Sequence, residues 1–179
     1  MNKLLFLFLF CGTLLMMVVM AKTGSSLKTA ETPNGILDLE LANTSLKTNR
    51  VIGAWKLVKD TDVVYNAKIN TWLDFIFIFF YSLFLFYCCG ILTANSKGWL
   101  NNIGHRFHRA IPIAGLFDIF ENTGMFLSLN GHVSDINSIF TTVCSASKWL
   151  IVIFALLYIA IGGGVILYQK ASKLKTKTD

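Results

Sequence analysis

The chain has 179 residues, of which 54% are hydrophobic and only 15% are charged. A soluble domain is about 45–50% apolar and about 25% charged, so this composition excludes an ordinary soluble domain and a disordered chain. The apolar residues form long runs, which indicates an integral membrane protein. Lys and Arg number 16 against 10 Asp and Glu, but no nucleic-acid-binding motif accompanies them, so no nucleic-acid partner is expected.

The first apolar run covers residues 4–19 and directly follows Lys3. A membrane-spanning helix needs about 20 residues, and residues 4–21 nearly reach that length. The same stretch has the basic start, the short apolar core and the small residue near its end, Ala21, that are typical of a cleaved signal peptide. Residues 1–21 are therefore either the first transmembrane helix or a signal peptide, and the sequence leaves both open.

Residues 22–71 form the longest polar segment of the chain. Within residues 36–41, leucines alternate with acidic residues, a pattern typical of an extended or edge segment. Val51, Trp55 and Val58 recur at the spacing of a helical apolar stripe. This stripe predicts an interfacial helix on the membrane surface, with Trp55 at the level of the lipid headgroups. The alternative is a small helix packed on its own loop.

Residues 72–168 contain three further apolar runs, at residues 72–94, 110–129 and 147–168. Each is long enough to cross a hydrocarbon layer of about 30 Å as a helix. Pro112 is expected in the first turn of the middle helix, where its missing N–H is no loss. The predicted fold class is all-α: an integral membrane bundle of three or four transmembrane helices, with an extracytoplasmic segment after the first and a three-helix membrane core.

Charged residues are distributed unevenly among the segments between these runs. Residues 95–109 hold three basic residues and no acid, and the tail at residues 169–179 holds four lysines. Residues 130–146, by contrast, hold Asp135 as their only charged residue. Because cytoplasmic loops carry an excess of Lys and Arg, this contrast predicts the orientation of a multi-pass protein, for which the expected location is the cell inner membrane. Its basic tail and C-terminus would be cytoplasmic, and residues 22–71 would lie outside.

The most informative polar residues lie in the run at residues 110–129. Asp118, Glu121 and Asn122 are spaced three and four residues apart, so a helix places all three on one face. That face must turn toward the inside of the bundle, because an ionised Asp in the middle of the bilayer costs at least about 2.5–3.5 kcal/mol. Candidate polar partners on the other helices are Asp74, Lys148, Tyr81 and Tyr158.

Two interpretations of this polar cluster remain open. It is a hydrogen-bonded cluster that fixes how the helices pack, or it handles protons or cations or supplies catalytic carboxylates. The first makes the protein structural or accessory, which is the preferred hypothesis. The second makes it a membrane-embedded enzyme or a proton-coupled carrier. The sequence leaves undecided whether the protein is an enzyme.

His105 and His108 stand three residues apart in the basic segment at residues 95–109. A metal site needs further ligands, and no carboxylate or cysteine lies nearby in the sequence, so no metal is expected. An anchor for anionic lipid headgroups is the preferred interpretation. Because the chain has neither a Cys-x-x-Cys pair nor a phosphate-binding glycine loop, no cofactor is expected either.

The lipid bilayer is the partner that the composition itself implies. Ala160 and Gly164 also have the four-residue spacing of small residues that allows two helices to approach closely. This spacing predicts self-association or contact with another membrane protein. The alternative is a flexible or kinked helix end at the three consecutive glycines, residues 162–164.

Several short motifs also follow one another in a characteristic order. They are Ile36-Leu-Asp-Leu-Glu-Leu-Ala, Trp55, Leu73-Asp74-Phe75-Ile76-Phe77 with Tyr81, Leu116-Phe-Asp118-Ile-Phe-Glu121-Asn122, and Lys148. In this order the chain resembles a group of small bacterial four-helix integral membrane proteins with a polar segment after the first helix and an Asp-x-x-Glu-Asn helix. The resemblance covers most of residues 36–160. It implies a four-helix membrane fold with no assigned activity, and it adds nothing about a substrate.

Overall fold

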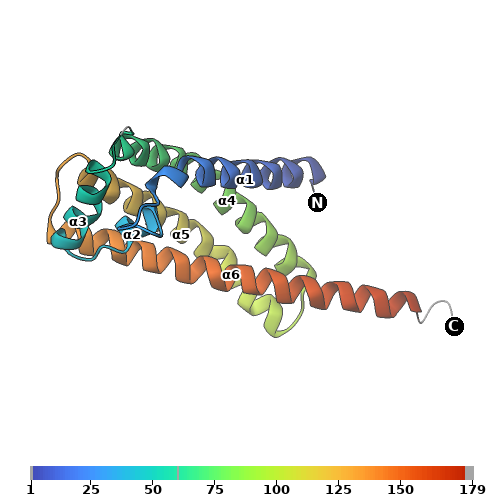
Figure 1. Cartoon of the computed structure of the whole chain (residues 1–179). Coiled ribbons are helices and arrows are strands. Elements are labelled where there is room, and N and C mark those ends of the chain that lie inside the picture. The colour runs from blue at the N-terminus through green and yellow to red at the C-terminus, as the bar shows by residue number, and fades with distance from the viewer. Residues whose placement is uncertain (1, 60, 176–179) are drawn as a thin grey trace.

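The computed structural model describes residues 2–59 and 61–175, and within them the chain is all-α, as the sequence predicts. In chain order the elements are α1 (Lys3–Thr23), η1 (Ser25–Leu27), α2 (Ile36–Glu40), α3 (Ser45–Lys56), α4 (Val63–Asn95), α5 (Trp99–Leu129) and α6 (Asp135–Lys175). The short elements η1, α2 and α3 belong to residues 24–59, which we call the cap. The cap lies at one end of the long helices (Figure 1).

Three helical stretches in the described part of the chain are long and apolar enough to cross a membrane: Lys3–Leu27, Val63–Asn95 and Asp135–Ile166. They indicate multi-pass membrane association. The remaining long helix, α5, is not among them, and its middle carries acidic and amide side chains. It instead packs against both α4 and α6, and these neighbours cover its polar face.

The long helices run side by side, with α4 between α1 and α5 (Figure 1). The connection from α5 to α6 lies at the cap end of the bundle. The connection from α4 to α5, the start of α1 and the far end of α6 all lie at the opposite end (Figure 1). The two ends of the bundle therefore differ in structure: one carries the cap, and the other carries a short connection and the outer ends of α1 and α6.

Two apolar cores are stacked along the bundle. The core next to the cap consists of Leu27, Leu39, Ile52, Trp55, Val63, Ala67, Met125 and Leu129. The core of the long helices consists of Ile78, Tyr81, Leu85, Cys89, Leu100, Ile111, Ala155 and Tyr158. Between these two cores lie Asp74 on α4 and Asp118, Glu121 and Asn122 on α5.

Small residues on α5 allow its neighbours to approach closely. A Cβ atom at Gly104 would overlap the hydroxyl groups of Tyr158 on α6 and Thr93 on α4. A Cβ atom at Gly124 would overlap the hydroxyl group of Thr141 on α6. These glycines therefore let α5 lie close to the helices that shield it.

The expected loop at residues 95–109 is mostly helical, because α5 begins at Trp99. The preceding residue, Gly98, has φ +63°, a conformation that glycine adopts without the clash of a side chain. The prediction that Pro112 opens this helix is therefore wrong, since Pro112 lies inside α5. Helices packed in a bundle tolerate an internal proline because neighbouring groups and local adjustments satisfy the freed carbonyl.

The helices on either side of α5 also begin earlier than the apolar runs indicate. The α4 helix begins at Val63, where the Asp62 carboxylate caps it by accepting a hydrogen bond of 2.9 Å from the Tyr65 N–H. The α6 helix begins at Asp135, after Ser134, whose hydroxyl oxygen accepts a hydrogen bond of 3.2 Å from the Asn137 N–H. These capped first turns extend both helices beyond their apolar runs.

The extended segment predicted at residues 36–41 is also wrong, because Ile36–Glu40 form the helix α2. Gly35 precedes it with φ +66°, which turns the chain sharply into the helix. Leu39 and Glu40 are buried, whereas the leucines on either side are exposed. The alternation is too short to distinguish a strand from a single helical turn.

The α3 helix forms where the apolar stripe predicts one, but Trp55 is not exposed to lipid headgroups as predicted. Trp55 is only 1% exposed and belongs to the core next to the cap. Its Nε1–H group lies 2.9 Å from the Leu27 carbonyl oxygen and 3.0 Å from the Thr32 hydroxyl oxygen, and both accept hydrogen bonds. The alternative, a small helix packed on its own loop, is therefore the structure adopted.

The cap is also bonded to the start of α6. The Asp135 carboxylate accepts a hydrogen bond of 2.7 Å from the Ser45 N–H, and the hydroxyl groups of Thr48 and Ser138 lie 2.8 Å apart. These contacts hold α3 against α6 and fix the cap over that end of the bundle.

We expect Trp55→Phe to destabilise the protein by about 1–3 kcal/mol, because it removes both hydrogen bonds that the buried indole donates in the cap. The free energy of unfolding, measured by denaturant titration in detergent micelles, checks this. Trp99→Phe is the matched control, since Trp99 is exposed. Equal stability of the two variants would show that the indole hydrogen bonds do not hold the cap.

Candidate functional site

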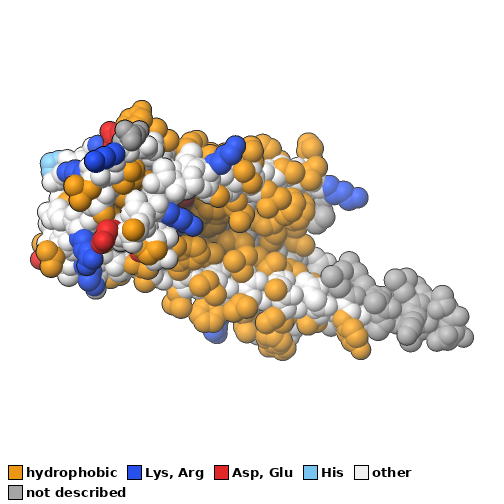
Figure 2. All heavy atoms as spheres, viewed as in Figure 1, with side chains coloured by type: hydrophobic (Ala, Val, Ile, Leu, Met, Phe, Trp, Pro, Cys, Tyr) orange, Lys and Arg blue, Asp and Glu red, His pale blue; other side chains and the backbone are white. Residues whose placement is uncertain are grey.

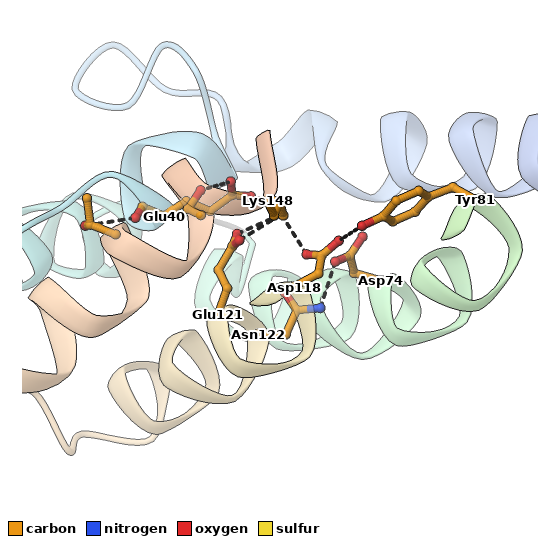
Figure 3. Close-up of polar contacts among 9 residues, drawn as sticks. Glu40, Asp74, Tyr81, Asp118, Glu121, Asn122 and Lys148 are labelled. Atoms are coloured by element: carbon orange, nitrogen blue, oxygen red, sulfur yellow. Dashed lines mark hydrogen bonds and ion pairs between the residues drawn. The ribbon is translucent and has the colours of Figure 1, made fainter. Parts of the chain in front are cut away.

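The structure brings together the charged and amide residues predicted for the polar cluster, and Tyr81 joins them (Figure 3). The Tyr158 hydroxyl instead lies 3.3 Å from that of Thr93, in the core of the long helices. Asp74 comes from α4, and Lys148 comes from α6. Asp118, Glu121 and Asn122 come from one face of α5, and all three side chains are buried. Their spacing along α5 turns them toward α4 and α6, so three helices meet at this cluster.

Lys148 forms the centre of the cluster. Its Nζ atom lies 2.7 Å from Asp118 Oδ1 and 2.9 Å from each carboxylate oxygen of Glu121. The side chains of Lys148, Asp118 and Glu121 are 9%, 4% and 0% exposed. Burying such charges is expensive, and only close pairing with good hydrogen bonds compensates for the lost hydration.

Two further hydrogen bonds extend the cluster along α4. The Tyr81 hydroxyl donates a hydrogen bond of 2.5 Å to Asp118 Oδ2, so both oxygens of this carboxylate have partners. Asn122 Nδ2 donates a hydrogen bond of 2.7 Å to Asp74 Oδ2. The structure therefore gives Asp74 an amide partner on α5 and no direct bond to Lys148. Asn122 Oδ1 is buried and has no hydrogen-bond partner among the described residues.

Glu40 is a member of this cluster that sequence reasoning missed. Its side chain is buried, and its Oε2 atom accepts a hydrogen bond of 3.2 Å from the Ser145 hydroxyl on α6. The Thr142 hydroxyl donates a hydrogen bond of 3.1 Å to the Glu40 backbone carbonyl (Figure 3). This bond holds α2 in place. An acid in a polar segment is normally solvated, so no signal in the sequence distinguished Glu40 from other surface acids.

The cluster contains more carboxyl groups than cationic groups. Four carboxyl groups, those of Glu40, Asp74, Asp118 and Glu121, lie close to the single ammonium group of Lys148 (Figure 3). Within residues 2–59 and 61–175, no group of His, Cys, Asp and Glu has an arrangement suited to a metal ion.

A pocket of about 480 Å³ opens beside the cluster, between α1, α4 and α6. The polar residues that line it are Glu40, Asp74, Asp118, Asn122 and Lys148, together with Tyr81, Asn70, Thr71, Thr13 and Trp149. The rest of its wall is apolar and includes Leu14 and Met17 of α1 and Val152 and Leu156 of α6. Figure 2 shows the surface hollowed between α1 and α6, with hydrophobic side chains around the opening.

The other sequence-predicted residues lie away from this pocket. His105 is exposed on α5, and His108 stacks on Phe86 of α4, with Nδ1 of His108 3.1 Å from the Phe86 carbonyl oxygen. They therefore lie on a helix and not in a loop. Ala160 and Gly164 are both exposed on α6, and no other part of the described structure would contact a Cβ atom at Gly164.

Comparison of the chain with known protein families, with curated proteins and with solved structures finds no match. The resemblance to small bacterial membrane proteins therefore stays an expectation from the sequence motifs. What the site can do has to be argued from its own geometry and charges.

We expect Lys148→Met to destabilise the protein by about 3–5 kcal/mol, because it leaves buried carboxylates without their cation. Adding Asp118→Asn and Glu121→Gln to the same chain removes those charges, so most of the lost stability should return. Denaturant titration of the single and the triple variant in detergent micelles checks both statements. A triple variant as unstable as Lys148→Met would show that unpaired charge is not the cause.

Proposed function

We propose that this chain is a small multi-pass protein of the bacterial inner membrane that binds a membrane-borne molecule in the pocket between α1, α4 and α6. The observation that supports this proposal is the position of the polar cluster, which lines a pocket whose walls are otherwise apolar. Small-molecule sites commonly combine apolar walls with a few polar groups that fix orientation. The cluster would be the polar anchor of such a site.

The opening of the pocket favours a ligand that arrives from the bilayer. Both helices at the opening, α1 and α6, are apolar enough to span a membrane. Leu14 and Leu156 line the pocket and are also about half exposed, so the apolar surface continues from the pocket to the outside of the bundle. A molecule dissolved in lipid could enter without crossing a polar surface.

A structural or accessory role is the second candidate. It is supported by the hydrogen bonds of the cluster, which join α4 to α5 at Asp74 and Tyr81 and α5 to α6 at Lys148. The pocket argues against this role as the whole function. Protein interiors are close-packed, and a void beside a purely structural cluster would forfeit packing contacts.

An enzyme or a proton-coupled carrier remains the other alternative. Its support is that Asp118, Asp74 and Lys148 line the pocket and could act on a bound molecule or exchange protons with it. Either activity would first require a molecule to bind in this pocket. Binding alone is therefore the proposal that needs the fewest assumptions.

We expect Leu14→Trp to fill the pocket from α1 and to lower ligand retention about tenfold, equivalent to a loss of about 1.4 kcal/mol of binding free energy. Native mass spectrometry of the purified protein would measure the molecules retained from the membrane. Leu15→Trp is the matched control, because Leu15 is exposed and does not line the pocket. Equal retention by all three proteins, or none by the wild type, would contradict the proposal and leave the structural role.

The charge distribution and the placement of the helix ends together support one orientation. The connection between α4 and α5, which is part of the basic segment at residues 95–109, lies at the same end as the start of α1 and the far end of α6, opposite the cap (Figure 1). A reporter fused after Asp179 should therefore be active in the cytoplasm, and one inserted near Ser45 should be active outside. The opposite pair of signals would overturn this orientation.

A further inference from the structure

The hydrogen-bond donors of the polar cluster are already used within the protein. The Tyr81 hydroxyl donates to Asp118, and the Asn122 amide donates to Asp74. The ammonium group of Lys148 donates to Asp118 and Glu121. Outside the cluster, the polar lining residues Asn70, Thr71 and Thr13 donate to protein oxygens as well. A ligand that needs hydrogen-bond donors finds few on the floor of this pocket.

The acceptors of the cluster are not all used. Asn122 lines the pocket and is fully buried, and its Oδ1 atom has no hydrogen-bond partner among the described residues. The bond from Asn122 Nδ2 to Asp74 fixes which end of the amide is the acceptor. The Asp74 carboxylate also lines the pocket, and within the described residues only its Oδ2 atom accepts a side-chain hydrogen bond. A buried acceptor without a partner, as Asn122 Oδ1 is, is costly, and a donor on a ligand would satisfy it.

The charges of the cluster favour the same kind of ligand. Its four carboxyl groups, those of Glu40, Asp74, Asp118 and Glu121, outnumber the single ammonium group of Lys148. An anionic head placed here would add like charge in a site shielded from water. A cationic head would pair with a carboxylate, and charge-assisted hydrogen bonds of this kind are about twice as strong as neutral ones.

The apolar part of the pocket suits a hydrocarbon chain. Its walls are formed by aliphatic and aromatic side chains of α1, α4 and α6, including Met17, Phe84 and Val152. The volume of about 480 Å³ lies within the range of ordinary small-molecule sites, about 300–1,000 Å³. A single chain fits this description, with its polar head at the cluster and its tail toward the opening between α1 and α6.

We propose, on the basis of the function proposed above, that the pocket binds an amphiphile with one apolar chain and a cationic head that donates hydrogen bonds, such as a long-chain primary amine. The ammonium group of the ligand lies between Asp74 and Asn122, donating to the Asp74 carboxylate and to Asn122 Oδ1. The Asp118–Lys148–Glu121 ion pairs remain intact and hold α5 and α6 around the bound head.

The test uses the full-length protein in lipid nanodiscs and a dodecylamine that carries a photoreactive diazirine at the end of its chain. Mass spectrometry maps the labelled residues, which should belong to α1 and α6 at the opening of the pocket. Competition then ranks dodecylamine, dodecanol and dodecanoate, which share one chain length and differ in the charge of the head. We expect dodecylamine to compete at about tenfold lower concentration than dodecanol, and dodecanoate to be the weakest.

Variants show whether the cluster sets this ranking. Asp74→Asn should abolish the preference for the amine over the alcohol. Glu31→Gln should keep it, because Glu31 is an exposed acid on the cap, paired only with the exposed Arg50. If Asp74→Asn does not fold, the ranking of the three competitors by the wild type still decides the matter.

The outcomes separate this inference from the function on which it rests. Equal competition by the three amphiphiles, or the strongest competition by dodecanoate, would overturn the preference for a cationic head and leave a lipid-facing binding site. Failure of all three to compete would overturn both. An Asp74→Asn variant that folds and keeps the amine preference would show that this carboxylate does not receive the head.

Discussion

The arrangement of the bundle depends on the ion pairs that Lys148 makes with Asp118 and Glu121. These charges are almost completely removed from solvent, and each would be costly without the others. Because the acids lie on α5 and the cation on α6, the two helices have to meet in one register. This requirement explains why the least apolar of the long helices lies among its neighbours, with its polar face covered and its glycines at the closest approaches.

The same cluster connects the cap to the long helices. Glu40 reaches α6 from a short helix of the cap, so an element far away in the sequence completes the polar region. On either side of the cluster lies an apolar core, one shared with the cap and one within the long helices. The polar layer is thus packed between two hydrophobic layers, which limits the access of water to it and leaves the lateral pocket as its open side.

The sequence predicted what depends on composition and helical spacing. Long apolar runs gave the helices, and the spacing of Asp118, Glu121 and Asn122 placed them together on one face. It failed where several short contacts decide the structure: Trp55 is buried because the cap offers acceptors for its indole, and Glu40 joins the site only through the fold of α2. The pocket could not be predicted, because its shape depends on the distance between α1 and α6. The sequences of these two helices do not indicate that distance.

The α1 helix forms one wall of the pocket, so the first residues of the chain also belong to the candidate site. The pocket is lined on this side by Phe10, Thr13, Leu14, Met17 and Met20, which all belong to residues 1–21, the segment whose sequence also fits a signal peptide. Proteolytic processing after Ala21 would therefore open the polar cluster directly to the surrounding lipid. Retention of residues 1–21 would keep the wall that α1 contributes to the pocket. Whether this segment is cleaved therefore decides whether the pocket has a wall on this side.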